Sequence, residues 1–123
     1  MKSWKLLLIV MLAIGLLTAC GGEAATEQAS EEVESTGNVV DLNIDATNFK
    51  FDQEEYRVNA GDTVNLSLTS SEGIHGILVK GLDITLKDGE TTSFVAKPGE
   101  YEIICNIMCG SGHSEMISTL VVE

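Results

Sequence analysis

A chain of 123 residues with a formal net charge of −12 is long enough for one folded domain but not for two, and its acidity excludes a nucleic-acid-binding protein. The 19 acidic residues outnumber the 7 basic ones, so the surface would repel anionic lipid and attract a cationic partner. An acidic surface also keeps an exported protein soluble, so the charge alone is a weak indicator of function.

The N-terminus has the pattern of a bacterial lipoprotein signal peptide. Lys2 and Lys5 precede an apolar run, residues 6–19, which is shorter than the roughly 20 residues that a membrane-spanning helix needs. The run ends at Ala19-Cys20-Gly21, which resembles the lipobox, where such a signal is removed before an acylated cysteine. We therefore expect residues 1–19 to be a signal peptide and Cys20 to carry a lipid anchor. An uncleaved anchor helix with a chance cysteine is the alternative.

The next segment has the composition of a linker. Residues 21–38 are rich in Glu, Ala, Ser, Thr and Gly, and their one large apolar residue is Val33. Such a segment cannot bury enough apolar surface to fold alone. We expect residues 20–38 to be a flexible acidic tether that joins a folded domain, residues 39–123, to the extracytoplasmic face of the cell membrane.

From Val39 onward, apolar residues recur with the period of two that indicates half-buried β-strands. Seven short runs follow this pattern or are continuously apolar, namely 40–44, 64–68, 77–79, 84–86, 93–95, 101–104 and 117–122. Turn-forming pairs such as Asp88-Gly89 and Pro98-Gly99 separate them. Seven or eight short strands without an amphipathic helix predict an all-β fold, an antiparallel sandwich or barrel with one modest core.

Metal-capable side chains gather before the last predicted strand. The segment CNIMCGSGHSEM contains Cys105, Cys109, His113 and Met116, and His75, the other histidine of the chain, lies in an earlier loop. Thiolate, imidazole and thioether are the donors that copper prefers over harder ions. Because a sandwich presents its loops at its two ends, the loop with His75 can lie beside the later segment. These residues therefore predict a copper site.

Three other interpretations of the same residues stay open. His75, Cys109, His113 and Met116 alone satisfy a mononuclear copper site with a weak axial thioether, which leaves Cys105 as a buried thiol. Two cysteines and two histidines would also suit zinc, with Met116 only packing in the core. Finally, outside the cytoplasm Cys105 and Cys109 could pair as a disulfide, which would make the remaining donors coincidental.

The spacing Cys-x3-Cys-x3-His-x2-Met resembles the binuclear copper-A domain of cytochrome c oxidase subunit II, most closely the short bacterial type. The segments Ile74-His75-Gly76 and PGEYEIICN, which ends at Asn106, match the same family. The resemblance covers roughly residues 39–123 and implies a cupredoxin-like Greek-key fold. It also implies the ligands: Cys105 and Cys109 would bridge two copper ions, His75 and Met116 would complete one of them, and His113 with the backbone carbonyl of Ile107 would complete the other.

The resemblance implies a function in electron transport. A metal site filled with protein ligands suits electron transfer and does not suit substrate turnover, so we expect no catalytic residues and no oxidase activity of this chain alone. A cationic cytochrome c-like donor would pass electrons through it to a haem-copper oxidase catalytic subunit. A copper storage or delivery protein with the same ligands is the alternative function.

The chain departs from the family pattern in two respects. Ile107 stands where Glu or Gln is common; a carbonyl ligand tolerates any side chain, but in many oxidases the Glu helps hold a metal at the interface with the catalytic subunit. In addition, we expect a lipid and a tether in place of the usual spanning helices. If electrons enter over an aromatic residue, as in the family, Phe49, Phe51, Tyr56 or Tyr101 must serve, although such residues usually fill the core.

Overall fold

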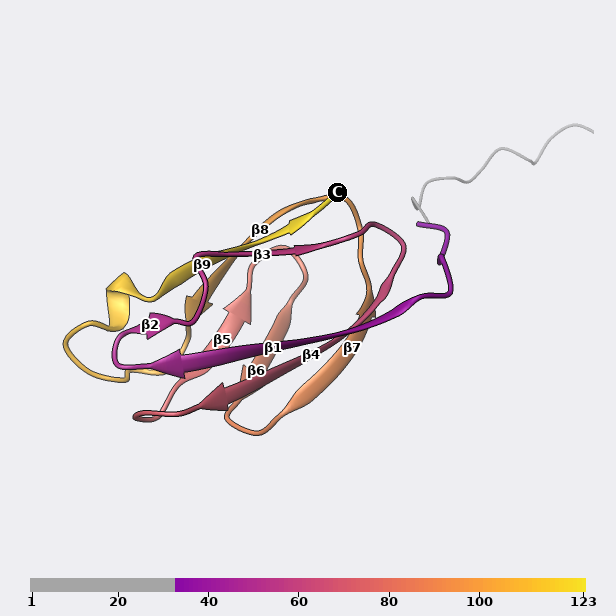
Figure 1. The fold of residues 1–123 in the computed structure, drawn as a ribbon. Helices are drawn as coiled ribbons and strands as arrows, with labels where there is room; N and C mark the ends of the chain where they lie inside the picture. The colour runs from indigo at the N-terminus through magenta and orange to yellow at the C-terminus, as the bar shows by residue number, and fades with distance from the viewer. Residues whose placement is uncertain (1–32) are drawn as a thin grey trace, which may run out of the picture. The chain divides into compact units, whose positions relative to one another are not determined.

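The computed structural model describes residues 33–123, so the predicted signal peptide, Cys20 and most of the predicted tether lie outside the described residues. Nine strands and one short 3-10 helix follow one another along this part of the chain (Figure 1). They are β1 (Val39–Thr47), β2 (Lys50–Phe51), β3 (Glu55–Val58), β4 (Thr63–Ser70), β5 (Gly76–Val79), β6 (Ile84–Lys87), β7 (Thr91–Val95), β8 (Gly99–Cys105), η2 (His113–Glu115) and β9 (Ile117–Val122). Within residues 33–123, no helix is long and apolar enough to cross a membrane.

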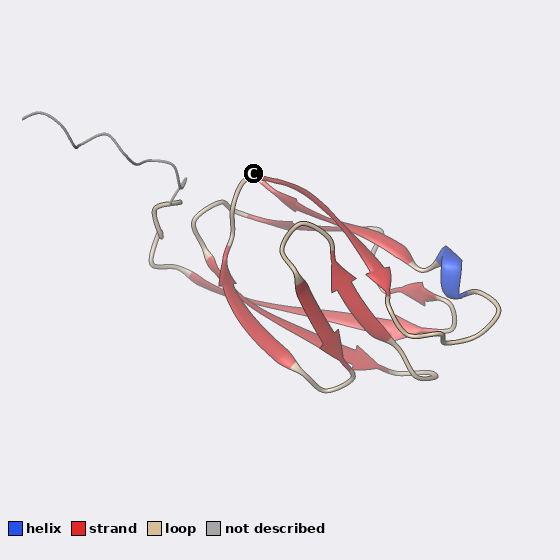
Figure 2. Ribbon diagram, turned by 180° about the vertical axis from the view of Figure 1, so that it is seen from behind, coloured by secondary structure: helices blue, strands red, loops and turns tan. Residues whose placement is uncertain are grey.

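The strands form two sheets that pack face to face. Figure 2 shows them from the side opposite to that of Figure 1. One sheet has the order β2-β1-β4-β7 and the other the order β3-β9-β8-β5-β6. The predicted all-β sandwich is confirmed, and all seven predicted strands are present as β1 and β4 to β9.

The expectation of purely antiparallel pairing is wrong at two places. β1 pairs with β4 in parallel, and β3 pairs with β9 in parallel, whereas the other neighbours are antiparallel. Parallel neighbours need a crossover connection, and the chain provides one by placing β3 in the second sheet between β1 and β4. The two sheets are therefore joined by connections that pass from a strand of one sheet to a strand of the other, such as those on either side of β3.

Apolar residues from both sheets fill the space between them. Every second residue of β4 points inward, so that Val64, Leu66 and Leu68 are fully buried, and Ile103 and Leu120 meet them from the other sheet. Burying one such side chain contributes about 1.5–3 kcal/mol relative to leaving it exposed. This packing makes the sandwich a rigid support for the loops at its ends.

The first described residues are attached to the domain. The backbone N–H of Thr36 donates to the Gly61 carbonyl at 2.8 Å, and its hydroxyl donates to Asp62 Oδ1 at 2.5 Å. The side-chain amide of Asn38 donates to the same carboxylate at 3.3 Å. These donors, the Thr36 hydroxyl first among them, lower the pKa of Asp62. The segment that leads into β1 is thus bound to the turn between β3 and β4.

Candidate metal centre

The predicted ligands lie at one end of the sandwich, where the loop from β8 to β9 passes beside the turn from β1 to β2 (Figure 1). Cys105 is the last residue of β8, and Met116 directly precedes β9. β5 pairs with β8 so that Ile77 stands opposite Cys105. Because His75 comes only two residues before Ile77, this strand pairing brings the histidine next to the first cysteine.

The two cysteine sulfurs form the centre of the cluster. Cys105 Sγ lies 3.4 Å from Cys109 Sγ and 4.0 Å from His75 Nδ1, and it donates to the carbonyl oxygen of Ile107 at 3.2 Å. Cys109 Sγ lies 3.6 Å from His113 Nδ1 and 3.6 Å from Met116 Sδ. All six donor atoms expected from the sequence are therefore linked by contacts through the two sulfurs.

These separations suit bound metal. Donor atoms bound to one ion at about 2.0–2.3 Å lie about 3.5 Å apart in a tetrahedral arrangement, which is close to the spacings found here. The ligating atoms of His75, Cys105 and Cys109 all lie within 4.8 Å of one another. Both thiols are free, and their 3.4 Å separation is well beyond the roughly 2.05 Å of a disulfide. The donor set of two thiols, two imidazoles and a thioether fits copper.

Half of the six predicted ligand residues are shielded from water. His75, Cys105 and Met116 are buried, whereas Ile107, Cys109 and His113 are partly exposed. Burial, together with the hydrogen bond and the charge of Cys105, raises the pKa of the Cys109 thiol. Without metal the Cys109 thiol is therefore held in its protonated form, and a metal ion that binds its sulfur must displace that proton.

His75 presents one particular ring nitrogen to the sulfurs. Its Nε2 lies 2.8 Å from the backbone carbonyl oxygen of Glu72. A carbonyl oxygen only accepts hydrogen bonds, so Nε2 carries a hydrogen, and in the neutral ring Nδ1 keeps its lone pair. This is the tautomer in which Nδ1, the atom nearer Cys105, can bind a metal.

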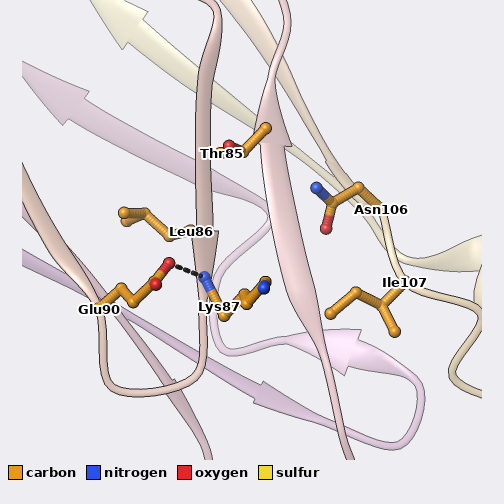
Figure 3. A pocket seen from close by; sticks show the side chains of 6 residues that line it. All are labelled: Thr85, Leu86, Lys87, Glu90, Asn106 and Ile107. Atoms are coloured by element: carbon orange, nitrogen blue, oxygen red, sulfur yellow. Dashed lines mark hydrogen bonds between the residues drawn. The ribbon is translucent and has the colours of Figure 1, made fainter.

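Gly76 makes room for the residue whose carbonyl is a predicted ligand. A Cβ at Gly76 would lie 2.5 Å from Asn106 Oδ1 and 2.7 Å from Ile107 Cδ1. Asn106 and Ile107 also line one side of a small pocket, opposite Thr85 and Lys87 of β6 (Figure 3). The side chain of Ile107 thus packs against the sheet and has no oxygen with which to bind a metal.

Some aromatic residues lie in the core of the sandwich, and one lies at the candidate metal centre. Phe51 and Tyr56 are buried in the core, as large aromatics in short strands usually are. Phe49 is half-buried, and its ring stands edge-on to that of His75, with the centroids 6.5 Å apart. A Cβ at Gly110 would lie 2.8 Å from the Phe49 ring, and one at Gly112 would collide with it. Phe49 therefore covers the loop that carries Cys109 and His113.

Comparison with known proteins connects this fold and site to a family. The chain is 32% identical over 102 residues to cytochrome c oxidase subunit 2 of Thermus thermophilus, which is 79% of this chain and 76% of that protein. A second Thermus thermophilus sequence of the same subunit gives the same alignment length and identity, and 61% of it is covered. No family model matches the chain.

Solved structures agree with this result. A heme-copper terminal oxidase dimer contains a chain with 26% identity and a TM-score of 0.59, covering 99% of this chain and 91% of that one. The periplasmic domain of cytochrome oxidase subunit II from Bradyrhizobium japonicum has 14% identity, a TM-score of 0.58, and covers 75% and 88% of the two chains. Reduced rusticyanin has 19% identity, a TM-score of 0.56 and coverage of 74% and 83%. The last two structures share the cupredoxin fold of this chain.

Proposed function

Since the chain belongs to the cytochrome c oxidase subunit II family, we propose that it is an electron-transfer protein with a copper-A-type site for two copper ions. The observation that carries this proposal is the convergence of four donor atoms on the adjacent sulfurs of Cys105 and Cys109. Bound copper would supply a one-electron redox couple. The two sulfurs and four further donors would fill the coordination of two ions, so neither ion would keep an open position for substrate.

The protein contributes a fixed and shielded set of ligands. The ligating segments begin or end at strands β5, β8 and β9 of one sheet, so the donors move little relative to one another. His75 and Met116 are fully buried, which excludes water from that side of the site. A site that keeps its geometry in both oxidation states favours rapid electron transfer, because little reorganisation accompanies it.

Apolar side chains beside the ligands support a docking surface for a redox partner. Ile74, Met108 and Ile117 are 75%, 80% and 54% exposed, and each directly neighbours a proposed ligand in the sequence. Exposed large apolar side chains that gather near a functional site mark interaction surfaces. We propose that a cationic cytochrome c-like protein docks here, attracted by the acidic chain, and that Phe49 is the aromatic residue closest to the electron's path.

The acceptor and the location complete the proposal. We propose that the acceptor is a haem-copper oxidase catalytic subunit, which would carry out any oxygen chemistry. We further propose that residues 1–19 are a signal peptide and that a lipid on Cys20 holds the protein at the extracytoplasmic face of the cell membrane. Replacing Cys20 by Ser should release the protein from membranes; continued membrane association would contradict the lipid anchor.

The deciding experiment is copper stoichiometry with electron paramagnetic resonance on the purified, copper-loaded protein. Two coppers per chain, with hyperfine structure from one electron shared by both, are expected. One copper with a mononuclear signal, or no redox-active copper, would overturn the binuclear site. Copper that a chelator removes rapidly would contradict electron transfer and favour storage or delivery.

A further inference from the structure

A side chain outside the predicted ligand set also reaches His75. Asn48, in the turn between β1 and β2, places its Oδ1 3.2 Å from His75 Nε2. The same Nε2–H donates to the Glu72 carbonyl at 2.8 Å, so the hydrogen is shared between two acceptors. One acceptor belongs to the loop of His75 itself, and the other comes from a turn that is distant in the sequence.

We propose that Asn48 is a positioning residue for the metal centre and that it acts through His75. Its amide oxygen holds the ring in the orientation that directs Nδ1 toward the sulfur of Cys105. The proposal deepens the proposed function and rests on it for the effect on copper. The contact between Asn48 and His75 does not depend on copper and can be tested without it.

The surrounding residues leave space for this contact. Gly73 has a φ of +79°, and a Cβ there would collide with Asn48 Oδ1 and lie 3.0 Å from His75 Nε2. The backbone N–H of Asn48 donates to the Glu72 carboxylate at 3.3 Å. The turn and the 72–75 loop are therefore joined by two hydrogen bonds of Asn48, one to the residue before Gly73 and one to His75.

The neighbour of Asn48 extends the contact to the second ligand loop. The ring of Phe49 stands edge-on to the His75 ring, and it fills the space that Cβ atoms at Gly110 and Gly112 would occupy. The 48–49 turn thus touches the loops that supply His75 on one side and His113 on the other. Asn48 is the residue of this turn that bonds directly to a proposed ligand.

The physical consequence follows from the chemistry of imidazole ligands. A hydrogen bond from the outer N–H of a metal-binding histidine fixes its tautomer and ring orientation and raises its basicity. The Glu72 carbonyl is a backbone group and remains in any variant. Asn48 is the acceptor that substitution can remove, and its loss leaves the ring with one acceptor in place of two.

The test begins with the metal-free protein. Exchange of the His75 Nε2 proton with solvent is measured by nuclear magnetic resonance in the wild type, Asn48→Ala, Asn48→Asp and Asn65→Ala. Asn65 lies on β4 and bonds to Asp41, away from the site, and serves as the matched control. We expect roughly three- to tenfold faster exchange in Asn48→Ala, slow exchange in Asn48→Asp, which keeps an acceptor oxygen, and no change in Asn65→Ala.

Copper binding gives the second readout. Asn48→Ala should weaken copper binding by about tenfold, the lower end of the effect of such outer partners, and should shift the reduction potential. Asn48→Asp should not weaken copper binding, and it should lower the reduction potential, because its added negative charge favours the more positive, oxidised copper. Unchanged proton exchange in Asn48→Ala would overturn the proposal. If the wild type binds no redox-active copper, the proposed function fails, and the exchange rates alone still decide the role of Asn48.

Discussion

The two cysteines have different neighbours, so their removal should have different effects. Cys105 contacts the donors of His75 and Ile107, whereas Cys109 contacts those of His113 and Met116. Without Cys105, the thiol, imidazole and thioether around Cys109 still form the donor set of a mononuclear copper site. The difference between the cysteines therefore distinguishes the binuclear interpretation from the mononuclear one.

Cys105→Ser should bind one copper per chain and show the hyperfine pattern of a single copper nucleus. Metal analysis with electron paramagnetic resonance on the loaded variant checks this. Cys109→Ser is the matched comparison and should lose the site more completely, because Cys105 would keep contact with only the His75 imidazole and the Ile107 carbonyl, without a thioether. A Cys105→Ser spectrum identical to that of the wild type would contradict a bridging role for this sulfur.

Met116→Leu separates packing from ligation. Met116 is 1% exposed and belongs to the core cluster, so a substitution of similar volume should cost less than about 1.5 kcal/mol of stability. The variant should keep its copper and change its reduction potential, because a weak thioether ligand is lost. Thermal unfolding and a redox titration measure the two effects. Complete loss of copper would mean that the thioether is a stronger ligand than proposed, and an unchanged potential would mean that Met116 only packs.

Residue patterns predicted which side chains lie together at the candidate metal centre, but not what supports them. Softness, number and spacing of side chains identify Cys105, Cys109 and His113 in a single segment, and the family resemblance adds the Ile107 carbonyl. The hydrogen bonds of His75 to Glu72 and Asn48 had no such signal, because an isolated Asn in a turn and a backbone carbonyl occur throughout any sequence. Only the folded arrangement brings them to the ring.

At the scale of strands, the sequence pattern predicted most elements and missed two. β2 contains two residues, too few to show a period. β3 alternates exposed Glu55 and Arg57 with buried Tyr56 and Val58, but its four residues follow an acidic stretch that is typical of a loop. The sequence pattern could not predict the parallel pairing either, because side chains alternate with a period of two in parallel and antiparallel strands alike.

The attachment of residues 33–38 to the β3–β4 turn should depend on pH. The pKa of Asp62 is lowered by hydrogen bonds from Thr36 and Asn38, so its carboxylate stabilises the folded state above the unfolded pKa of about 3.9. This stabilisation should be lost as pH falls through the lower, folded pKa. In Asp62→Asn, the melting temperature should therefore fall less steeply as the pH is lowered. The amide proton of Thr36 should also exchange faster with solvent.

Melting curves between neutral and acidic pH, with hydrogen exchange at Thr36, test this prediction. Asp41→Asn is the control, because Asp41 accepts one hydrogen bond from Asn65 on the exposed face of the sheet. It should leave exchange at Thr36 unchanged. An acid limb in Asp62→Asn as steep as that of the wild type would assign the pH dependence to other carboxyl groups.

For the whole molecule, the fold and family follow from sequence more directly than the partners do. The strand pattern and the copper motif both depend on residues within one domain, and the relationship to cytochrome c oxidase subunit II agrees with them. A partner is recognised by a surface, and a surface is assembled from residues that are distant in sequence. Met108 and Ile117 lie in and directly after the loop between β8 and β9, whereas Ile74 lies in the earlier loop before β5, and only the fold brings these two segments to the same end of the sandwich.

The proposed docking of a cationic donor makes a prediction about salt. Attraction between an acidic protein and a cationic cytochrome c is long-ranged, so the rate at which the reduced cytochrome reduces the copper-loaded protein should fall steeply as ionic strength rises. A small uncharged reductant should show little salt dependence.

Met108→Ser should slow the cytochrome reaction without changing its salt dependence, because it removes apolar contact and no charge. Stopped-flow kinetics at several salt concentrations measure the wild type and Met108→Ser with each of the two reductants. A cytochrome reaction insensitive to salt would mean that the acidic residues keep the protein soluble and do not steer its donor, and equal slowing with both reductants would mean that Met108 affects the metal site itself.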